Sequence, residues 1–178
     1  MSIDYAKTLR GAIAGALAAG VWAGQMPLDK RAFASDFDDV ALLGKALTRT
    51  DAWPVAGWAL HLGNGALFGA AYANLAPRLP LPSWARGPVA ASAENLLTWP
   101  LTALTDRLHP ARKKLPELLS NPRAFAQSAW RHLLFGVVLG ELERRLNAQE
   151  PAVAEPPPMA HHASSNGHGT LAHAIPAG

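Results

Sequence analysis

Long uncharged segments separated by short charged ones dominate the chain and predict an all-α protein. The longest runs from Ala52 to Pro77, 26 residues without Asp, Glu, Lys or Arg, and Gly11 to Leu28 forms another of 18 residues. An uncharged run of this length can cross a bilayer as a helix. The pattern therefore predicts an integral membrane four-helix bundle with spans at about 11–28, 54–76, 87–105 and 122–142.

The two long connections between these segments are charged, and each is predicted to contain a short interfacial helix. In the first, Ser35-x-x-Asp38 is a possible capping box ahead of apolar residues at helical spacing. In the second, Leu115, Leu118 and Leu119 follow a basic stretch. Such helices could lie on a membrane surface.

The second and fourth segments share a motif, His-x-x-x-Gly-x-x-x-Gly, which begins at His61 and again at His132. The first and third segments both open with Arg-Gly, so the chain reads as a 2+2 internal repeat. Small residues allow helix backbones to approach closely. Eight glycines are predicted to pack helices: Gly11, Gly15, Gly20, Gly24, Gly65, Gly69, Gly136 and Gly140.

The composition bears on the location of the protein, on the chemistry available to it and on its partners. Charged residues make up 16% of the chain, below the roughly 25% usual for soluble domains. The mean hydropathy of +0.05 is low for a membrane protein and opposes the membrane interpretation. There is no cysteine, which excludes disulfides and thiolate chemistry. The net charge is only +3, and the Lys and Arg residues are spread over the segment ends, so nucleic acid is not an expected partner.

The distribution of residue types along the chain also predicts its domain organisation. Residues 1–147 are predicted to form the four-helix domain. Residues 148–178 are rich in proline and histidine and poor in bulky apolar side chains, so they are predicted to be a disordered tail. Four histidines in this tail could bind metal weakly, although a solvated spacer is the simpler interpretation.

The order of features resembles the YagU-like inner-membrane proteins, a family of small multi-helix bacterial proteins. The resemblance covers residues 10–147, with low identity and no catalytic signature. It rests on four segments of the chain: Met26-Pro27-Leu28, Tyr72 to Pro77, Trp99-Pro100-Leu101, and Arg131-His132-Leu133 with Glu141 to Leu146. The family implies an architecture and a location in the bacterial inner membrane, and no defined reaction. We expect cytoplasmic termini, because a polar tail of about 30 residues is most simply left inside.

Ionisable groups at membrane depth are costly and often functional. The expected polar intramembrane centre contains His61, Glu94, Arg131 and His132. From Glu94, three threonines at positions 98, 102 and 105 continue at helical spacing and give one polar face. One interpretation is mutual satisfaction, with Glu94 paired to Arg131. No residue is assigned a catalytic or metal-binding role, and no cofactor is expected.

Several functions are compatible with this centre. The leading hypothesis is an accessory or packing protein without catalytic activity, with the lipid bilayer and either itself or another membrane protein as partners. One alternative is a transporter-like proton pathway through the His and Glu side chains, because neutral His titrates near physiological pH. Another is a b-type haem held by His61 and His132. A soluble alanine-rich helical bundle is the architectural rival. No Gly-x-Ser-x-Gly, His-Glu-x-x-His or phosphate-binding loop supports an enzyme.

Overall fold

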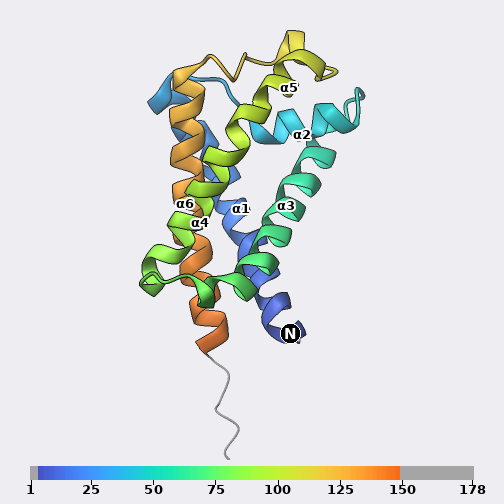
Figure 1. Cartoon of the computed structure of the whole chain (residues 1–178). Helices are drawn as coiled ribbons and strands as arrows, with labels where there is room; N and C mark the ends of the chain where they lie inside the picture. The colour runs from blue at the N-terminus through green and yellow to red at the C-terminus, as the bar shows by residue number, and fades with distance from the viewer. Residues whose placement is uncertain (1–3, 149–178) are drawn as a thin grey trace, which may run out of the picture.

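A computed structural model describes residues 4–148, and every regular element in that range is helical. The long helices are α1 (Tyr5–Phe33), α3 (Trp53–Leu75), α4 (Ser83–Thr98) and α6 (Pro122–Ala148). They pack lengthwise as a bundle, with α2 (Asp39–Leu47) lying across one end (Figure 1). The start of α1 and the end of α6 lie together at the opposite end. The predicted all-α fold is confirmed.

Local sequence signals explain where several helices begin and end. The Asp4 carboxylate accepts a hydrogen bond from the Lys7 amide and caps α1. Asn121 caps α6 by accepting from the amides of Arg123 and Ala124. At its other end α1 stops at Ala34, whose left-handed φ of 48° lets its own amide and that of the next residue bond back to the last turn.

The first predicted connecting helix exists, but the second does not. α2 begins after Asp38, whose side chain accepts from the Ala41 amide at 2.8 Å. Residues 115–121 are not helical. Instead, the Asp106 carboxylate accepts hydrogen bonds from the amides of Leu118 and Leu119, both at 3.0 Å. These two amides are satisfied by a side chain, so a helical turn is not needed to pair them.

The third predicted segment is interrupted near its proline. α4 ends at Thr98, a 3₁₀ turn η2 (Trp99–Leu101) contains Pro100, and α5 (Thr102–Leu108) continues the chain. Proline lacks an amide hydrogen and crowds the preceding turn, so it breaks a regular helix there. Two further 3₁₀ turns, η1 (Ala76–Arg78) and η3 (Arg112–Lys114), lie in the connections.

Glycine contacts between backbones hold the bundle together. A Cβ atom placed on Gly15 would collide with the carbonyl oxygen of Gly65, and Gly11 and Gly69 meet in the same way, so α1 and α3 touch along their backbones. Between α4 and α6, a Cβ on Gly87 would collide with the Gly136 carbonyl oxygen. The two halves of the chain therefore use the same packing device.

Not all of the eight predicted packing glycines lie at such contacts. A Cβ on Gly24 would have no atom within 4 Å, and one on Gly20 would meet only the end of the Leu62 side chain at 3.9 Å. Gly140 has ordinary contacts, at 3.5 Å from Gly87 and Tyr72. The buried face of α1 instead runs through Gly11, Ala14, Gly15, Ala18, Trp22 and Asp29. Spacing of four drifts around a helix of 3.6 residues per turn, which is why Gly24 leaves the contact face.

The location predicted from the uncharged segments is wrong. Of the helices formed by residues 4–148, none combines the length with the apolar content that a bilayer crossing requires. Absence of charge is not the same as apolarity. Much of α3 consists of Gly, Ala, His61 and Asn64, and α6 carries Arg131 in its middle. The predicted inner-membrane location and the orientation of the termini fall with this finding. The predicted tail at 148–178 starts at the last residue of α6, and residues 149–178 lie outside the described residues.

Replacement of Gly15 by Ala should destabilise the fold by about 2–3 kcal/mol, because the new methyl group would overlap a backbone oxygen that can move only with its helix. Gly24→Ala is the matched control in the same helix. It should stabilise the protein by up to about 1 kcal/mol, since alanine favours helix over glycine and the position is open. Urea unfolding followed by circular dichroism measures both. Equal effects of the two substitutions would contradict the packing role of Gly15.

Candidate functional site

The most buried charged group in the described chain is Arg131, in the middle of α6, with a side chain 0% exposed. Its Nε and Nη2 donate to the two carboxylate oxygens of Asp29 at 2.6 and 2.7 Å, a bidentate pair. Nη1 donates to Asp39 at 2.6 Å, and Nη2 also reaches the Phe37 carbonyl oxygen at 3.0 Å. One cation thus joins the end of α1, the start of α2 and the middle of α6.

Neutral donors complete this cluster. Gln127, one turn before Arg131, donates to Asp29 at 2.7 Å, and the Trp22 indole donates to Asp39 at 3.0 Å. Burial alone would raise the pKa of Asp29, but hydrogen bonds from Arg131 and Gln127 and the charge of Arg131 outweigh it and lower the pKa. The pKa of Arg131 is raised, because its bonds and charge interactions with Asp29 and Asp39 outweigh the opposing effect of burial.

The expected pair of Glu94 with Arg131 does not form. Glu94 on α4 instead contacts His132, with Oε2 2.9 Å from Nε2. The other ring nitrogen, Nδ1, lies 2.8 Å from the Ser128 carbonyl oxygen, which only accepts, so Nδ1 is the donor. The Glu94 carboxylate accepts a hydrogen bond from Nε2 when that nitrogen also carries a proton. This contact ties α4 to α6 beside the charged cluster.

His61 on α3 is anchored differently. Its Nε2 donates to the Ala19 carbonyl oxygen on α1 at 3.1 Å. Burial is the largest influence on this ring and lowers its pKa, although Asp39 and the bond to Ala19 act in the opposite direction. His61 is therefore neutral at pH 7, and its Nδ1 carries a lone pair that no described residue engages.

The repeated motif has a structural explanation. In each copy the histidine lies one turn before a glycine that touches a neighbouring helix, so both residues share a face. His61 and Gly65 both meet α1, and His132 and Gly136 both meet α4. Close backbone approach at the glycine places a polar group of that neighbour within reach of the ring.

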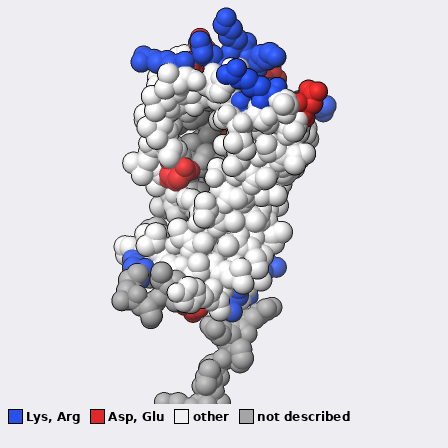
Figure 2. Space-filling model, turned by 90° about the vertical axis from the view of Figure 1, so that its right-hand side faces the viewer, with Lys and Arg blue, Asp and Glu red and all other residues white. Residues whose placement is uncertain are grey.

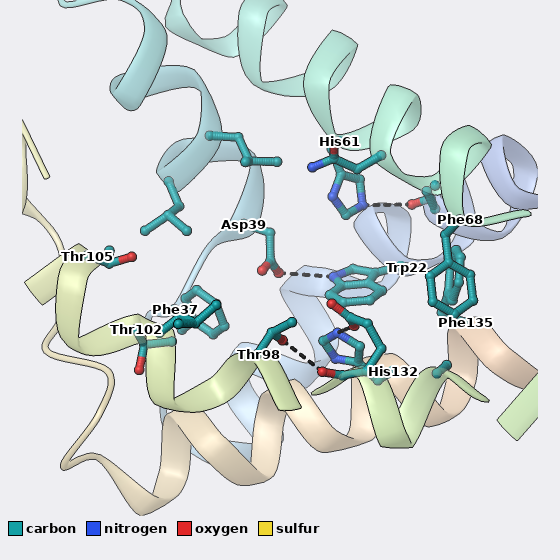
Figure 3. Close-up of a pocket in the computed structure, with 18 of the residues that line it drawn as sticks. Trp22, Phe37, Asp39, His61, Phe68, Thr98, Thr102, Thr105, His132 and Phe135 are labelled. Carbon is teal, nitrogen blue, oxygen red and sulfur yellow. Dashed lines mark hydrogen bonds and ion pairs between the residues drawn. The ribbon is translucent and has the colours of Figure 1, made fainter. Parts of the chain in front are cut away.

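Trp22 lies between the two histidines, as Figure 3 shows. Its ring centroid is 5.4 Å from that of His61 and 4.6 Å from that of His132, with both pairs in edge-to-face geometry. Two axial ligands of one iron would need their nitrogens to face each other across an open slot. The arrangement does not fit a haem held by both histidines. Among residues 4–148, no group of three or more His, Asp or Glu side chains is placed to hold a metal ion.

These groups surround a cavity of about 390 Å³. Trp22, Asp39, His61 and His132, labelled in Figure 3, line it. Glu94 lines it as well. The walls come from every α-helix of the described chain, and the space-filling view shows a hollow in the mostly uncharged middle of the molecule, with an acidic residue beside it (Figure 2). The sequence-predicted polar face of Glu94 and the three threonines lines this cavity.

Three of the four expected centre residues thus line the cavity: His61, Glu94 and His132. Arg131 is fully buried and does not line it. Sequence reasoning missed Asp29 and Asp39, because both lie in segments assigned to the edge of a loop. A usable signal existed: a mid-helix arginine with no acidic residue nearby in α6 needs a partner from elsewhere.

The chain matches no known family, no curated protein and no solved structure. The resemblance to the YagU-like proteins therefore stays a prediction, and the site must be interpreted from its own geometry.

Asp29→Asn should destabilise the protein by about 3–5 kcal/mol at pH 7, because it leaves Arg131 buried with reduced compensation. The pH dependence of the folding stability provides a second test of this contact. The folded-state pKa of Asp29 lies below its ordinary value of 3.8, so its stabilising effect is complete above that value and is lost as the pH falls through the folded pKa.

Urea unfolding between pH 7 and pH 3 measures this effect. Wild type should lose more stability over the acid range than Asp29→Asn. Asp36→Asn, at an exposed position, is the control and should follow wild type. If Asp29→Asn and wild type showed parallel pH profiles, the cluster would not be the source of acid sensitivity.

Proposed function

We propose that this protein binds a small, mainly apolar ligand that carries a protonated amine. The observation that carries the proposal is the cavity among the helices, apolar on most of its walls and supplied with hydrogen-bond acceptors. Its volume of about 390 Å³ is in the range of small-molecule sites. Such sites combine apolar walls with a few placed polar groups that orient the ligand.

The apolar walls include aromatic rings from four different parts of the chain. They are Trp22, Phe37, Phe68 and Phe135. Aromatic faces attract organic cations, especially where water is excluded. Leucines of α2 and an alanine of α4 add further apolar surface. This lining supports a ligand with a hydrocarbon or aromatic body.

The polar groups of the cavity favour a ligand group that donates hydrogen bonds over one that accepts them. Arg131 neutralises only one of its two carboxylate partners, so that cluster keeps one negative charge, and Asp39 lines the cavity. Glu94 offers a carboxylate, and His61 offers a lone pair. The guanidinium of Arg131 is held by Asp29 and Asp39, so it does not balance a ligand anion. A ligand ammonium group could donate to these acceptors.

The other functions weighed from the sequence receive less support. A proton pathway would need continuous hydrogen-bonded steps, and the Trp22 ring separates His61 from His132. Haem ligation conflicts with the same ring. Glu94 is the residue on which ligand binding can best be tested, because it lies at the cavity and its side chain is 38% exposed.

Binding of three probes with one apolar body would test the proposal: 4-phenylbutylamine, 4-phenylbutanol and 4-phenylbutanoate, each titrated by isothermal calorimetry. We expect the amine to bind more tightly than the other two. Glu94→Gln should weaken amine binding by about tenfold and leave the alcohol unchanged, because it removes charge and preserves shape.

Glu117→Gln, an exposed position outside the cavity, is the matched control and should bind the amine as wild type does. The amine proposal would be wrong if 4-phenylbutanoate bound more tightly than the amine, or if Glu94→Gln left the affinity for the amine unchanged.

A second candidate function, self-association as an accessory or packing protein, is favoured by one outer face. On α1, aliphatic side chains recur every four residues and stay exposed: Leu9 63%, Ile13 46%, Leu17 54% and Val21 45%. They form a continuous apolar row on the side of α1 that faces away from the bundle. Contiguous exposed apolar surface commonly marks a protein contact. A second copy of this chain could cover the row with its own.

Sedimentation velocity over a concentration series would test self-association. Wild type should form dimers, and Ile13→Glu with Leu17→Glu should shift the protein to monomer, because charges would be buried in the contact. Leu97→Glu, at an exposed apolar position on α4, serves as the control and should keep the dimer. Monomeric wild type at all concentrations would rule out this candidate.

A further inference from the structure

We propose that the protein has a second binding site, a basic cleft at the end of the bundle where α2 lies, that takes a multiply charged phosphate group. The cleft has a volume of about 530 Å³. One side is the end of α2 and the turn that follows it, and the other is the segment around η3. Five cationic side chains line it: Lys45, Arg49, Arg112, Lys113 and Lys114.

The charge of the cleft is concentrated and unbalanced. Five cations and a single carboxylate, Asp51, line the cleft, so its lining carries a net charge of +4. Arg112 and Lys113 also line an adjoining pocket with Asp106 and Glu117. The whole chain carries only +3, so the remaining residues together carry a net charge of −1. None of the five makes an ion pair with a residue in the described range 4–148. Figure 2 shows Lys and Arg side chains gathered at this end.

The two sides of the cleft are fixed by the fold. The buried His109 ring donates from Nε2 to the Leu42 carbonyl oxygen at 3.0 Å, and its Nδ1 accepts from the Ala111 amide at 3.0 Å. This ring pins the segment before η3 to α2. On the other side, a Cβ on Gly44 would collide with the Trp53 carbonyl oxygen, so α2 is seated directly on the start of α3.

The cleft suits a compact polyanion. Like charges held close together repel one another, and a ligand with several negative charges relieves that repulsion in one step. Arginine and lysine at this density match phosphate oxygens, because arginine donates in a fixed fork and lysine acts as a point charge. Lys45 lies over the Trp53 ring, 4.7 Å from its centroid, and both residues line the cleft. A single carboxylate would satisfy only part of this charge.

This site is separate from the central cavity. Leu42 and Leu43 of α2 line the cavity, whereas Lys45 and the residues after the helix line the cleft. The helix forms a wall of both, and the two sites favour ligand groups of opposite charge. The proposal therefore does not depend on amine binding.

Titration calorimetry with inorganic pyrophosphate at low salt tests the cleft. We expect binding that weakens as salt is raised, and Arg49→Gln with Arg112→Gln should weaken it by at least tenfold, because each side of the cleft loses one cation. The control is Arg31→Gln with Arg123→Gln, which removes the same charge from exposed positions outside the cleft and should leave the affinity within about twofold of wild type. Circular dichroism verifies that both double variants are folded.

A second arm distinguishes a free phosphate compound from a phosphorylated lipid headgroup. Flotation with phosphatidylcholine vesicles, with and without phosphatidic acid, is compared for wild type and both double variants. Pyrophosphate binding without flotation supports a free compound. Flotation that needs both phosphatidic acid and the two cleft arginines supports a headgroup. Absence of binding in both arms, or equal loss in the two double variants, would overturn the proposal.

Discussion

The buried contact of Arg131 with Asp29 and Asp39 is the constraint on which the rest of this structure depends. A guanidinium removed from water is stable only where its charge and its donors are matched, and two carboxylates with a backbone carbonyl do this here. Its three partners come from the end of α1, the start of α2 and the turn between them. The long connection between α1 and α3 is thereby held against α6.

That anchor also shapes the central cavity. Asp39 is bonded on one side to Arg131 and to the Trp22 indole, and Trp22 in turn packs against both histidines. The walls of the cavity are therefore tied to the charged cluster by direct contacts. Glycines play a complementary part. They bring α1 to α3 and α4 to α6 at backbone distance, and the space between these two close pairs is what the aromatic rings only partly fill.

The candidate sites follow from where charge is compensated and where it is not. In the centre, every cation is matched or outnumbered by carboxylates, which leaves an acceptor-rich cavity. At the α2 end of the bundle the reverse holds, because the cations from the α2 side and from η3 lie together with one acidic residue. Both arrangements combine segments that lie far apart in the sequence, and both rest on rings or glycines that fix the segments locally.

Much of the secondary structure was determined by the sequence itself. Capping residues such as Asp4 and Asn121 act on amides two or three positions away, so the helix starts that they set could be predicted. Proline decides less by itself, since Pro100 interrupts the third segment while Pro27 lies inside α1. The polar face that begins at Glu94 was also visible, since helical spacing alone places those side chains together. Helical spacing likewise places the histidine and the glycines of each His-Gly motif on one face.

The tertiary structure alone decided which groups meet. Glu94 and Asp29 are both acidic, and nothing local to Arg131 distinguishes one from the other as its partner. The choice depends on which helix ends come together in space. An uncharged segment likewise seemed long enough for a membrane span. Its glycines, however, make close helix contacts and add little apolar character. Local signals act over one or two helical turns, whereas ion pairing, cavity shape and charge clustering depend on contacts made across the whole bundle.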